Sequence, residues 1–139
     1  MHILVVEDNV ADARLIEEAI RDQKNFHKMS FVTDGRAAMA FVRQEEPYSG
    51  ARRPNLILLD LNLPYKEGRE VLMECKADPV LRHIPVIIWT STQADAEVRR
   101  LYELGAAAYC VKPHDLDDYL GLVQMIVEFW GRRARLPMG

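Results

Sequence analysis

The sequence predicts an α/β fold in which helices cover both faces of a doubly wound, five-stranded parallel sheet. Short apolar runs and longer amphipathic segments alternate along all 139 residues. Apolar runs of this length are typical of parallel strands that are buried on both faces. Most connections between the runs are short, as expected for consecutive right-handed strand–helix–strand units. The length suits one domain with one sheet.

Five strands and five helices are expected in alternation. The predicted strands cover residues 2–6, 29–33, 55–59, 85–89 and 107–111, and the predicted helices cover residues 10–23, 35–45, 67–77, 94–104 and 116–130. Right-handed crossovers leave few arrangements for such a chain, and we expect the flavodoxin-like strand order 2-1-3-4-5. In that order the first and third strands are neighbours.

Local signals support the elements in turn. The first helix carries an apolar stripe formed by Ala11, Leu15, Ile16, Ala19 and Ile20. The second begins at Gly35 or is capped by Asp34. Pro85 begins the fourth strand, where its missing N–H does least harm, and Gly105 ends the fourth helix. The long connection over residues 46–54 is interpreted as a surface loop, with a functional role left open.

Composition excludes several classes of protein. The net charge of −3 gives no footprint for a polyanion such as nucleic acid. The two cysteines, Cys75 and Cys110, indicate no disulfide framework, which favours the reducing cytoplasm. The apolar run before Glu7 is too short for a signal sequence or a membrane span. We therefore expect a cytoplasmic protein that binds neither nucleic acid nor membranes.

Polar side chains follow four of the apolar runs, at the point where each predicted strand ends. Glu7 and Asp8 follow the first strand, Asp60 the third, Thr90 the fourth and Lys112 the fifth. Ligands of open α/β sheets bind beyond the carboxyl ends of the strands, so these side chains should converge. Two carboxylates about 4 Å apart repel by roughly 4 kcal/mol at an effective dielectric constant near 20. Three of them therefore require a countercharge, and the oxygen-binding cation Mg²⁺ is the obvious one.

This set of groups favours phosphoryl transfer, because that chemistry depends on positioning and on neutralisation of charge. Asp60 is the predicted nucleophile, since it ends the central strand and a carboxylate can form an aspartyl phosphate. Asp8 is the predicted direct metal ligand, and Glu7 is expected to act directly or through a water molecule. Lys112 and Thr90 are expected to hold the phosphoryl oxygens.

Four segments together resemble those of response-regulator receiver domains, and the resemblance covers nearly the whole chain. They are residues 5–9 (VVEDN), 58–64 (LLDLNLP) with Gly68, 89–91 (WTS) and 109–113 (YCVKP). The resemblance implies that Asp60 takes a phosphoryl group from a phosphohistidine on a sensor histidine kinase. It also implies Mg²⁺ bound by Asp8, Asp60 and the backbone carbonyl of Asn62, with Glu7 standing where many relatives carry aspartate.

The same resemblance implies how the protein works. It implies that Thr90 and Tyr109 reorient on phosphorylation. Ser91 departs from the family pattern, which has Ala or Gly more often beside the phosphoryl group. The chain is then a phosphoacceptor that catalyses its own phosphorylation and dephosphorylation, not a turnover enzyme. Residues 47–54 and 78–85, with the ending Phe129-Trp130, resemble those of single-domain regulators paired with phytochrome-type histidine kinases. The chain ends soon after the fifth helix, so output is expected through protein contacts or onward phosphotransfer.

The last helix has apolar residues on more sides than one packed face requires. These are Leu116, Tyr119, Leu120, Leu122, Val123, Met125, Ile126, Val127, Phe129 and Trp130. The surplus predicts a second buried face. We expect residues 1–131 to form the receiver domain and the extension 132–139 to join this helix in a homodimer interface. Alternatively, the extension folds back over its own domain.

Three other functions agree less well with the sequence. A haloacid-dehalogenase-like Mg²⁺ phosphatase needs a second aspartate as general acid two residues after the nucleophile, where this chain has Asn62. A flavodoxin-like binding module needs Gly, Ser or Thr in its phosphate cradle, whereas Glu7 and Asp8 would repel a phosphate. A receiver-like domain that only binds partners should have lost the acidic pair or Lys112. Turnover of a phosphate ester would favour the first alternative, and a flavin absorbance the second.

Overall fold

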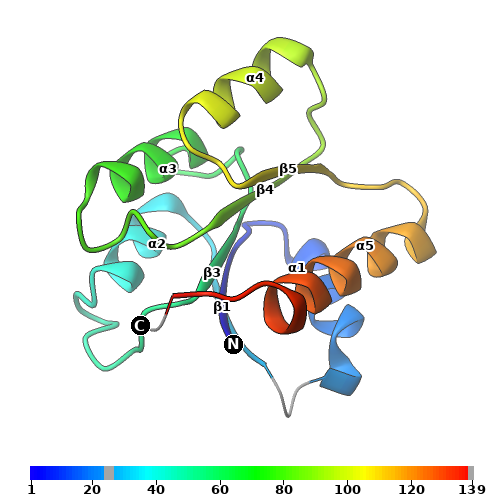
Figure 1. Ribbon diagram of the computed structural model, residues 1–139, viewed down its shortest axis with the longest axis horizontal. Helices are drawn as coiled ribbons and strands as arrows, with labels where there is room; N and C mark the ends of the chain where they lie inside the picture. The colour runs from blue at the N-terminus through cyan, green and yellow to red at the C-terminus, as the bar shows by residue number, and fades with distance from the viewer. Residues whose placement is uncertain (24–26, 138–139) are drawn as a thin grey trace.

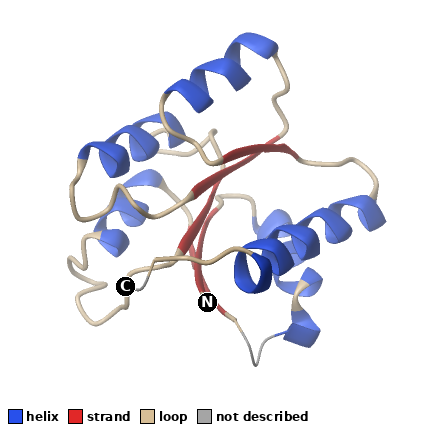
Figure 2. Ribbon diagram, viewed as in Figure 1, coloured by secondary structure: helices blue, strands red, loops and turns tan. Residues whose placement is uncertain are grey.

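The computed structural model describes residues 1–23 and 27–137. A central sheet lies between two layers of helices (Figures 1 and 2). The strands are β1 (His2–Val6), β2 (Lys28–Val32), β3 (Leu56–Leu59), β4 (Val86–Thr90) and β5 (Ala108–Val111). The α-helices are α1 (Val10–Ala19), α2 (Gly35–Val42), α3 (Gly68–Ala77), α4 (Asp95–Glu103) and α5 (Leu116–Glu128). All strand pairs are parallel and the order is β2-β1-β3-β4-β5, which confirms the predicted fold class and topology.

Alternation along the strands divides the core into two clusters. Leu4 and Val6 of β1 pack in the cluster that includes α2, α3 and α4. Ile3 and Val5 pack on the opposite face, in the cluster that includes α1 and α5. Because both faces of the central strands are covered, every residue of β1, β3 and β4 is buried. This two-sided burial explains why these strands are continuous apolar runs rather than alternating ones.

Two helices end three or four residues earlier than predicted. The first was expected to reach residue 23, but α1 ends at Ala19 and a 3₁₀ helix, η1 (Arg21–Gln23), follows. The N–H of Ile20 bonds to the carbonyl of Glu17, three residues back, which tightens the chain out of the α-helix. The second was expected to reach residue 45, but α2 ends at Val42 because Gln44 has a positive φ of 57°.

The last helix differs from its prediction in the type of helix near its end. It was expected to run to residue 130, but α5 ends at Glu128 and widens into a π-helix, η2 (Phe129–Arg133). The chain then crosses in front of the sheet to the C-terminal end (Figure 1). No helix within residues 1–23 and 27–137 is both long and apolar enough to cross a membrane.

The long connection between α2 and β3 packs on the domain. The ring of Tyr48 lies 5.2 Å from that of Phe41 of α2, measured between ring centroids. Arg53 donates a hydrogen bond of 3.0 Å from Nε to the carbonyl of Val42. These two contacts, from Tyr48 and from Arg53, hold the loop against α2.

Candidate functional site

The acidic residues meet because β1 and β3 are paired in register. Val6 lies opposite Leu59, and the N–H of Asp60 bonds to the carbonyl of Val6 at 3.0 Å. The three acidic residues that follow these strands, Glu7, Asp8 and Asp60, therefore lie at the same edge of the sheet. Carboxylate oxygens from all three lie within 4.8 Å of one another. Glu7 and Asp60 are buried, whereas Asp8 is exposed at the mouth of the site.

Lys112 follows β5, yet its side chain crosses to the acidic group. Its backbone N–H bonds to the carbonyl of Thr90, which anchors the start of the loop after β5. The ammonium donates to Glu7 Oε1 at 2.7 Å, to Asp60 Oδ2 at 3.1 Å and to Asp12 Oδ2 at 3.2 Å. Burial alone would lower the pKa of Lys112, but the hydrogen bonds and charges of Glu7 and Asp60 raise it above its usual value. The side chain therefore stays positively charged.

One ammonium does not balance this group of carboxylates. Glu7, Asp8, Asp12 and Asp60 surround a single lysine, so the local charge is negative. Burial, followed by the hydrogen bond and charge of Asp60, raises the pKa of Glu7 from 4.5 to about 9. Glu7 Oε2 is buried and has no hydrogen-bond partner among the described residues. A cluster of hard oxygen donors with an unpartnered oxygen and excess negative charge fits a divalent cation of the Mg²⁺ or Mn²⁺ type.

The loop after Asp60 depends on a glycine in α3. A Cβ atom on Gly68 would lie 2.4 Å from the carbonyl oxygen of Asp60, so any larger residue would displace this loop. The N–H of Gly68 bonds to the carbonyl of Leu61, and the N–H of Asn62 donates to Asp60 Oδ1 at 3.2 Å. With Oδ2 bonded to Lys112, both oxygens of the Asp60 carboxylate are fixed. The backbone of Asn62 is thereby held beside the acidic group.

Thr90, Ser91 and Tyr109 form a separate arrangement on the β4 side of the site. Thr90 is fully buried, and its Oγ1 accepts a long hydrogen bond of 3.4 Å from the N–H of Thr92. The hydroxyl of Tyr109 donates to the carbonyl of the same Thr92 at 2.7 Å. Ser91 is exposed. The structure therefore joins Thr90 and Tyr109 through one residue of the loop after β4, while the carboxylates bond to Lys112.

Two residues of the site were not predicted from the sequence. Asp12, on the first turns of α1, accepts from Lys112 and also accepts a 2.6 Å hydrogen bond from the hydroxyl of Tyr119 on α5. That hydroxyl in turn accepts from Trp89 Nε1 at 3.2 Å. Burial raises the pKa of Tyr119, and its bond to Asp12 raises it further. The acidic group is thus connected to the core of α5 through Asp12 and Tyr119.

Removing the Tyr119 hydroxyl should therefore weaken the fold. We expect Tyr119→Phe to lower the free energy of unfolding by about 2 kcal/mol, because Asp12 loses a hydrogen bond to a charged acceptor and the buried Trp89 N–H loses its acceptor. Urea denaturation of both proteins measures the difference. Tyr48→Phe is the matched control, since the Tyr48 hydroxyl has no hydrogen-bond partner in the described chain. Equal losses in the two variants would contradict the connection between α5 and the site.

Comparisons with known proteins agree with this geometry. A family model described as a response regulator receiver domain matches residues 3–124. Response regulator Rcp1 of Synechocystis sp. is 45% identical over 135 residues, which cover 97% of this chain and 92% of that protein. The crystal structure of the Mn²⁺-bound form of Rcp1 has a TM-score of 0.93 and 44% identity, covering 99% of each chain. The phosphorylated cyanobacterial phytochrome response regulator RcpA has a TM-score of 0.94 and 45% identity, covering 99% of this chain and 98% of that one.

Proposed function

This chain belongs to the response regulator receiver domain family, and from that premise we propose that Asp60 accepts a phosphoryl group from a phosphohistidine of a sensor histidine kinase. One observation carries the assignment of Asp60. The Lys112 ammonium donates to Asp60 Oδ2 while the Asn62 N–H donates to Asp60 Oδ1, so this carboxylate is held by both of its oxygens at the carboxyl edge of the sheet. This arrangement supplies a nucleophilic carboxylate and a fixed positive charge beside it.

In the proposed reaction an oxygen of the Asp60 carboxylate attacks phosphorus. The O–P bond forms as the P–N bond to the donor histidine breaks, and the bonding electron pair returns to the imidazole. Lys112 neutralises part of the charge on the phosphoryl oxygens. The Asn62 N–H on Oδ1 limits rotation of the carboxylate, so the attacking oxygen is held in place. These groups belong to the chain itself, which is why we propose that it catalyses its own phosphorylation and dephosphorylation.

Receiver domains bind a divalent metal, and we assign Mg²⁺ to the acidic group here. Asp8, Asp60 and the backbone carbonyl of Asn62 are the proposed direct ligands, with Glu7 bound directly or through water. Bound Mg²⁺ supplies the positive charge that the phosphoryl oxygens require in addition to Lys112. The proximity of the three carboxylates and the unpartnered Oε2 of Glu7 support this assignment.

Thr90, Ser91 and Tyr109 are the proposed switch. The long bond between Thr90 Oγ1 and the Thr92 N–H is weak, so the hydroxyl can exchange it for a phosphoryl oxygen. Because Tyr109 is bonded to the carbonyl of Thr92, a shift of this loop would release the Tyr109 ring. Ser91, exposed beside Thr90, borders the phosphoryl group in this arrangement. Phosphorylation would thereby change the surface next to α4 and β5.

We propose a phytochrome-type histidine kinase as the partner, acting in the cytoplasm. The support is the similarity over nearly the full chain to RcpA, which is described as a phytochrome response regulator. Output would then pass through contacts of this domain with other proteins.

The test uses a small phosphodonor, such as acetyl phosphate, in place of the kinase. With Mg²⁺, intact mass spectrometry should show one added phosphoryl group on the wild-type protein, and none on Asp60→Asn. Without Mg²⁺, the wild type should gain little, because the oxygen charges are not neutralised. Asp78→Asn, which alters an aspartate at the C-terminal end of α3, is the control and should be phosphorylated normally. Phosphorylation of Asp60→Asn at the wild-type rate would refute the assignment of the nucleophile.

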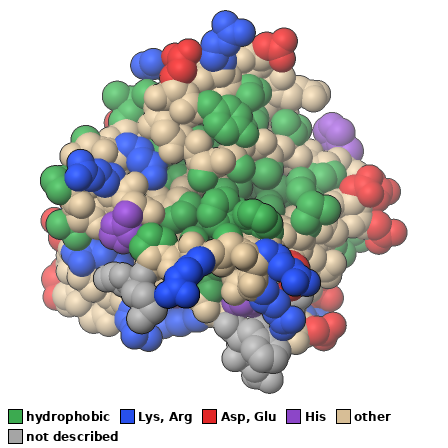
Figure 3. Space-filling view, viewed as in Figure 1, with side chains coloured by type: hydrophobic (Ala, Val, Ile, Leu, Met, Phe, Trp, Pro, Cys, Tyr) green, Lys and Arg blue, Asp and Glu red, His purple; other side chains and the backbone are tan. Residues whose placement is uncertain are grey.

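We also propose that α5 and the extension 132–139, of which residues 138–139 lie outside the described part of the chain, form a homodimer interface. Met125 and Phe129 are 66% and 51% exposed, although they belong to the most apolar segment of the chain. Figure 3 shows hydrophobic side chains gathered across the face that includes β5, α5 and the C-terminal segment. Exposed apolar side chains grouped in this way favour a protein partner, and a second copy of the chain presents the complementary surface.

The oligomeric state tests the dimer. At micromolar concentration, light scattering should give the mass of a dimer for the full chain and of a monomer for Met125→Glu, because the new carboxylate would be buried without a partner. Met73→Glu is the matched control, since Met73 is also exposed but lies on α3 in the other helical layer. A full-length monomer would contradict the proposal, as would equal dissociation of both variants.

A further inference from the structure

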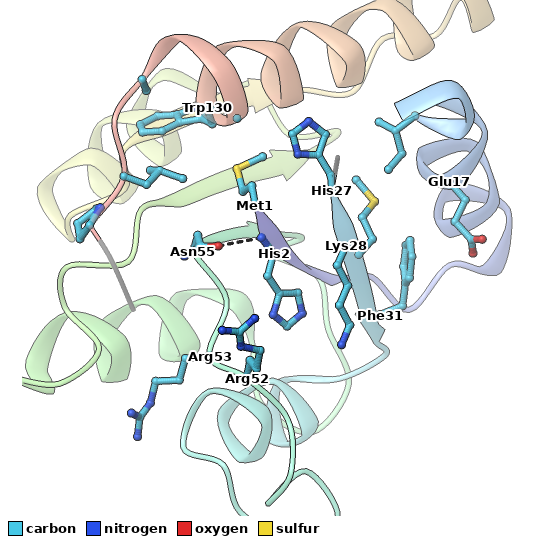
Figure 4. A pocket seen from close by; sticks show the side chains of 16 residues that line it. Met1, His2, Glu17, His27, Lys28, Phe31, Arg52, Arg53, Asn55 and Trp130 are labelled. Carbon is cyan, nitrogen blue, oxygen red and sulfur yellow. Dashed lines mark hydrogen bonds between the residues drawn. The ribbon is translucent and has the colours of Figure 1, made fainter. Parts of the chain in front are cut away.

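A large cavity lies at the opposite end of the sheet from Asp60. Its volume is about 890 Å³, within the range that small-molecule sites occupy. The start of β1, the start of β2 and the end of the loop before β3 form its floor, and η2 with the C-terminal segment forms one wall (Figure 4). No residue of the proposed phosphorylation site lines it.

Unpaired positive charges gather at one side of this cavity. Lys28 and Arg52 are exposed there and form no ion pair with any described carboxylate. Figure 4 shows the ring of His2 between them. Burial lowers the pKa of His2, and the positive charges of Lys28, Arg52 and the N-terminus lower it further, so these cations act on one small region. Glu17 is the acidic residue that lines the cavity, and it lies on α1, away from Lys28 and Arg52 (Figure 4).

The other side of the cavity is apolar and contains a buried imidazole. Met29, Phe31 and Trp130 line it. His27 is 8% exposed, and neither of its ring nitrogens has a hydrogen-bond partner among the described residues. A Cβ atom on Gly131 would lie 2.6 Å from Cε1 of His27, so η2 packs directly on this ring. An unpartnered polar ring in an apolar wall is costly unless a bound molecule supplies the missing contact.

From this distribution of charge we propose that the cavity binds a small organic anion. Its carboxylate, sulfonate or phosphate would contact Lys28 and Arg52 beside the ring of His2, and its aromatic or aliphatic part would lie against Met29, Phe31 and Trp130. Arginine and lysine form charge-assisted hydrogen bonds with such anions, and the apolar wall excludes water from the rest of the ligand. The site is separate from Asp60 and does not depend on phosphorylation.

Two probes that differ in charge test this inference. The anionic dye 8-anilinonaphthalene-1-sulfonate should bind the full-length protein saturably and shift the amide resonances of Lys28 and Met29 and the indole resonance of Trp130. Lys28→Gln/Arg52→Gln should weaken its binding by about tenfold, the change expected for loss of a charge-assisted contact. The uncharged N-phenyl-1-naphthylamine should bind the double variant and the wild type equally. Both substituted residues are exposed, so the fold should persist.

The control removes two positive charges elsewhere. Arg14 and Arg99 are exposed and do not line the cavity, so Arg14→Gln/Arg99→Gln should bind the anionic dye as the wild type does. The inference would be overturned by no saturable binding of the dye, by equal weakening in the two double variants, or by resonance shifts confined to the surroundings of Asp60. An anionic dye that binds the Lys28→Gln/Arg52→Gln variant with wild-type affinity would equally reject an anion site.

Discussion

Lys112→Met should lower the free energy of unfolding of the metal-free protein by about 3 kcal/mol near neutral pH, and the melting temperature by roughly 10 °C. The ammonium is the cation that contacts Glu7 and Asp60, and both carboxylates are buried. Methionine fills a similar volume but offers no charge, so the cost comes from leaving the buried Asp60 carboxylate beside Glu7 without its cation. Thermal unfolding in the presence of a chelator measures it.

The cost of losing Lys112 should grow only above about pH 9, where Glu7 of the wild type loses its proton. Glu7 has a pKa of about 9 in the folded protein, compared with 4.5 for an unperturbed glutamate. The folded state therefore holds a proton that the unfolded state releases between these values, and stability falls as pH increases across this window. Loss of Lys112 should raise the pKa of Glu7 further, because the ammonium stabilises the charged form of Glu7. The wild type already holds this proton at about pH 8, so the deficit of Lys112→Met should be nearly equal at about pH 5.5 and about pH 8 and should grow only above about pH 9.

Two further variants distinguish the loss of the Lys112 charge from a simple loss of packing. Lys76→Met removes a half-buried lysine whose ammonium bonds only to the carbonyls of Arg82 and Ile84 among the described residues, and its cost should be smaller than that of Lys112→Met because no buried carboxylate loses its cation. Glu7→Gln combined with Lys112→Met should recover part of the lost stability, since glutamine, unlike Glu7, does not have to take up a proton on folding. If the double variant is less stable than Lys112→Met alone, repulsion between Glu7 and Asp60 is not the cause.

The sheet and most of the site could be predicted because the signals are local. An apolar run ending in a polar residue identifies a buried strand and its functional edge, and this pattern located Glu7, Asp8, Asp60, Thr90 and Lys112. Helix ends were predicted less well: a positive φ at Gln44 ends α2 without a glycine or proline to mark it. The π-helix after α5 contains Gly131, but the close packing of this glycine on His27 is a tertiary contact that no local pattern predicts.

Asp12 and Tyr119 were missed for a physical reason. Their contact depends on how closely α1 and α5 pack on the same face of the sheet, and no local pattern encodes that distance. A partial signal exists, since Asp12 lies four residues after Asp8, about one helical turn further along. Tyr119 was predicted only as an apolar residue of the last helix. A buried tyrosine hydroxyl needs a partner, and this requirement could have directed attention to an acidic residue on a neighbouring helix.

Asp8→Asn should change stability and phosphorylation in opposite directions. Without metal, we expect the melting temperature to rise by a few degrees, because one carboxylate leaves a group whose oxygens lie within 4.8 Å of one another. Asp8 is exposed, so solvent limits this gain to about 1 kcal/mol or less. With Mg²⁺, the wild type should gain stability, since a ligand that binds only the folded state stabilises it, and the variant should gain little.

Phosphorylation provides the second measurement on the same protein. The rate of Mg²⁺-dependent phosphorylation from acetyl phosphate should fall at least about a hundredfold in Asp8→Asn, because an amide cannot supply the negative charge of a metal-binding carboxylate. Asp117→Asn, an exposed aspartate in the first turn of α5, should show neither the rise in stability nor the loss of phosphorylation. A lower melting temperature for metal-free Asp8→Asn would mean that the carboxylates at the ends of β1 and β3 do not repel one another, and the reason for placing a cation between them would be lost.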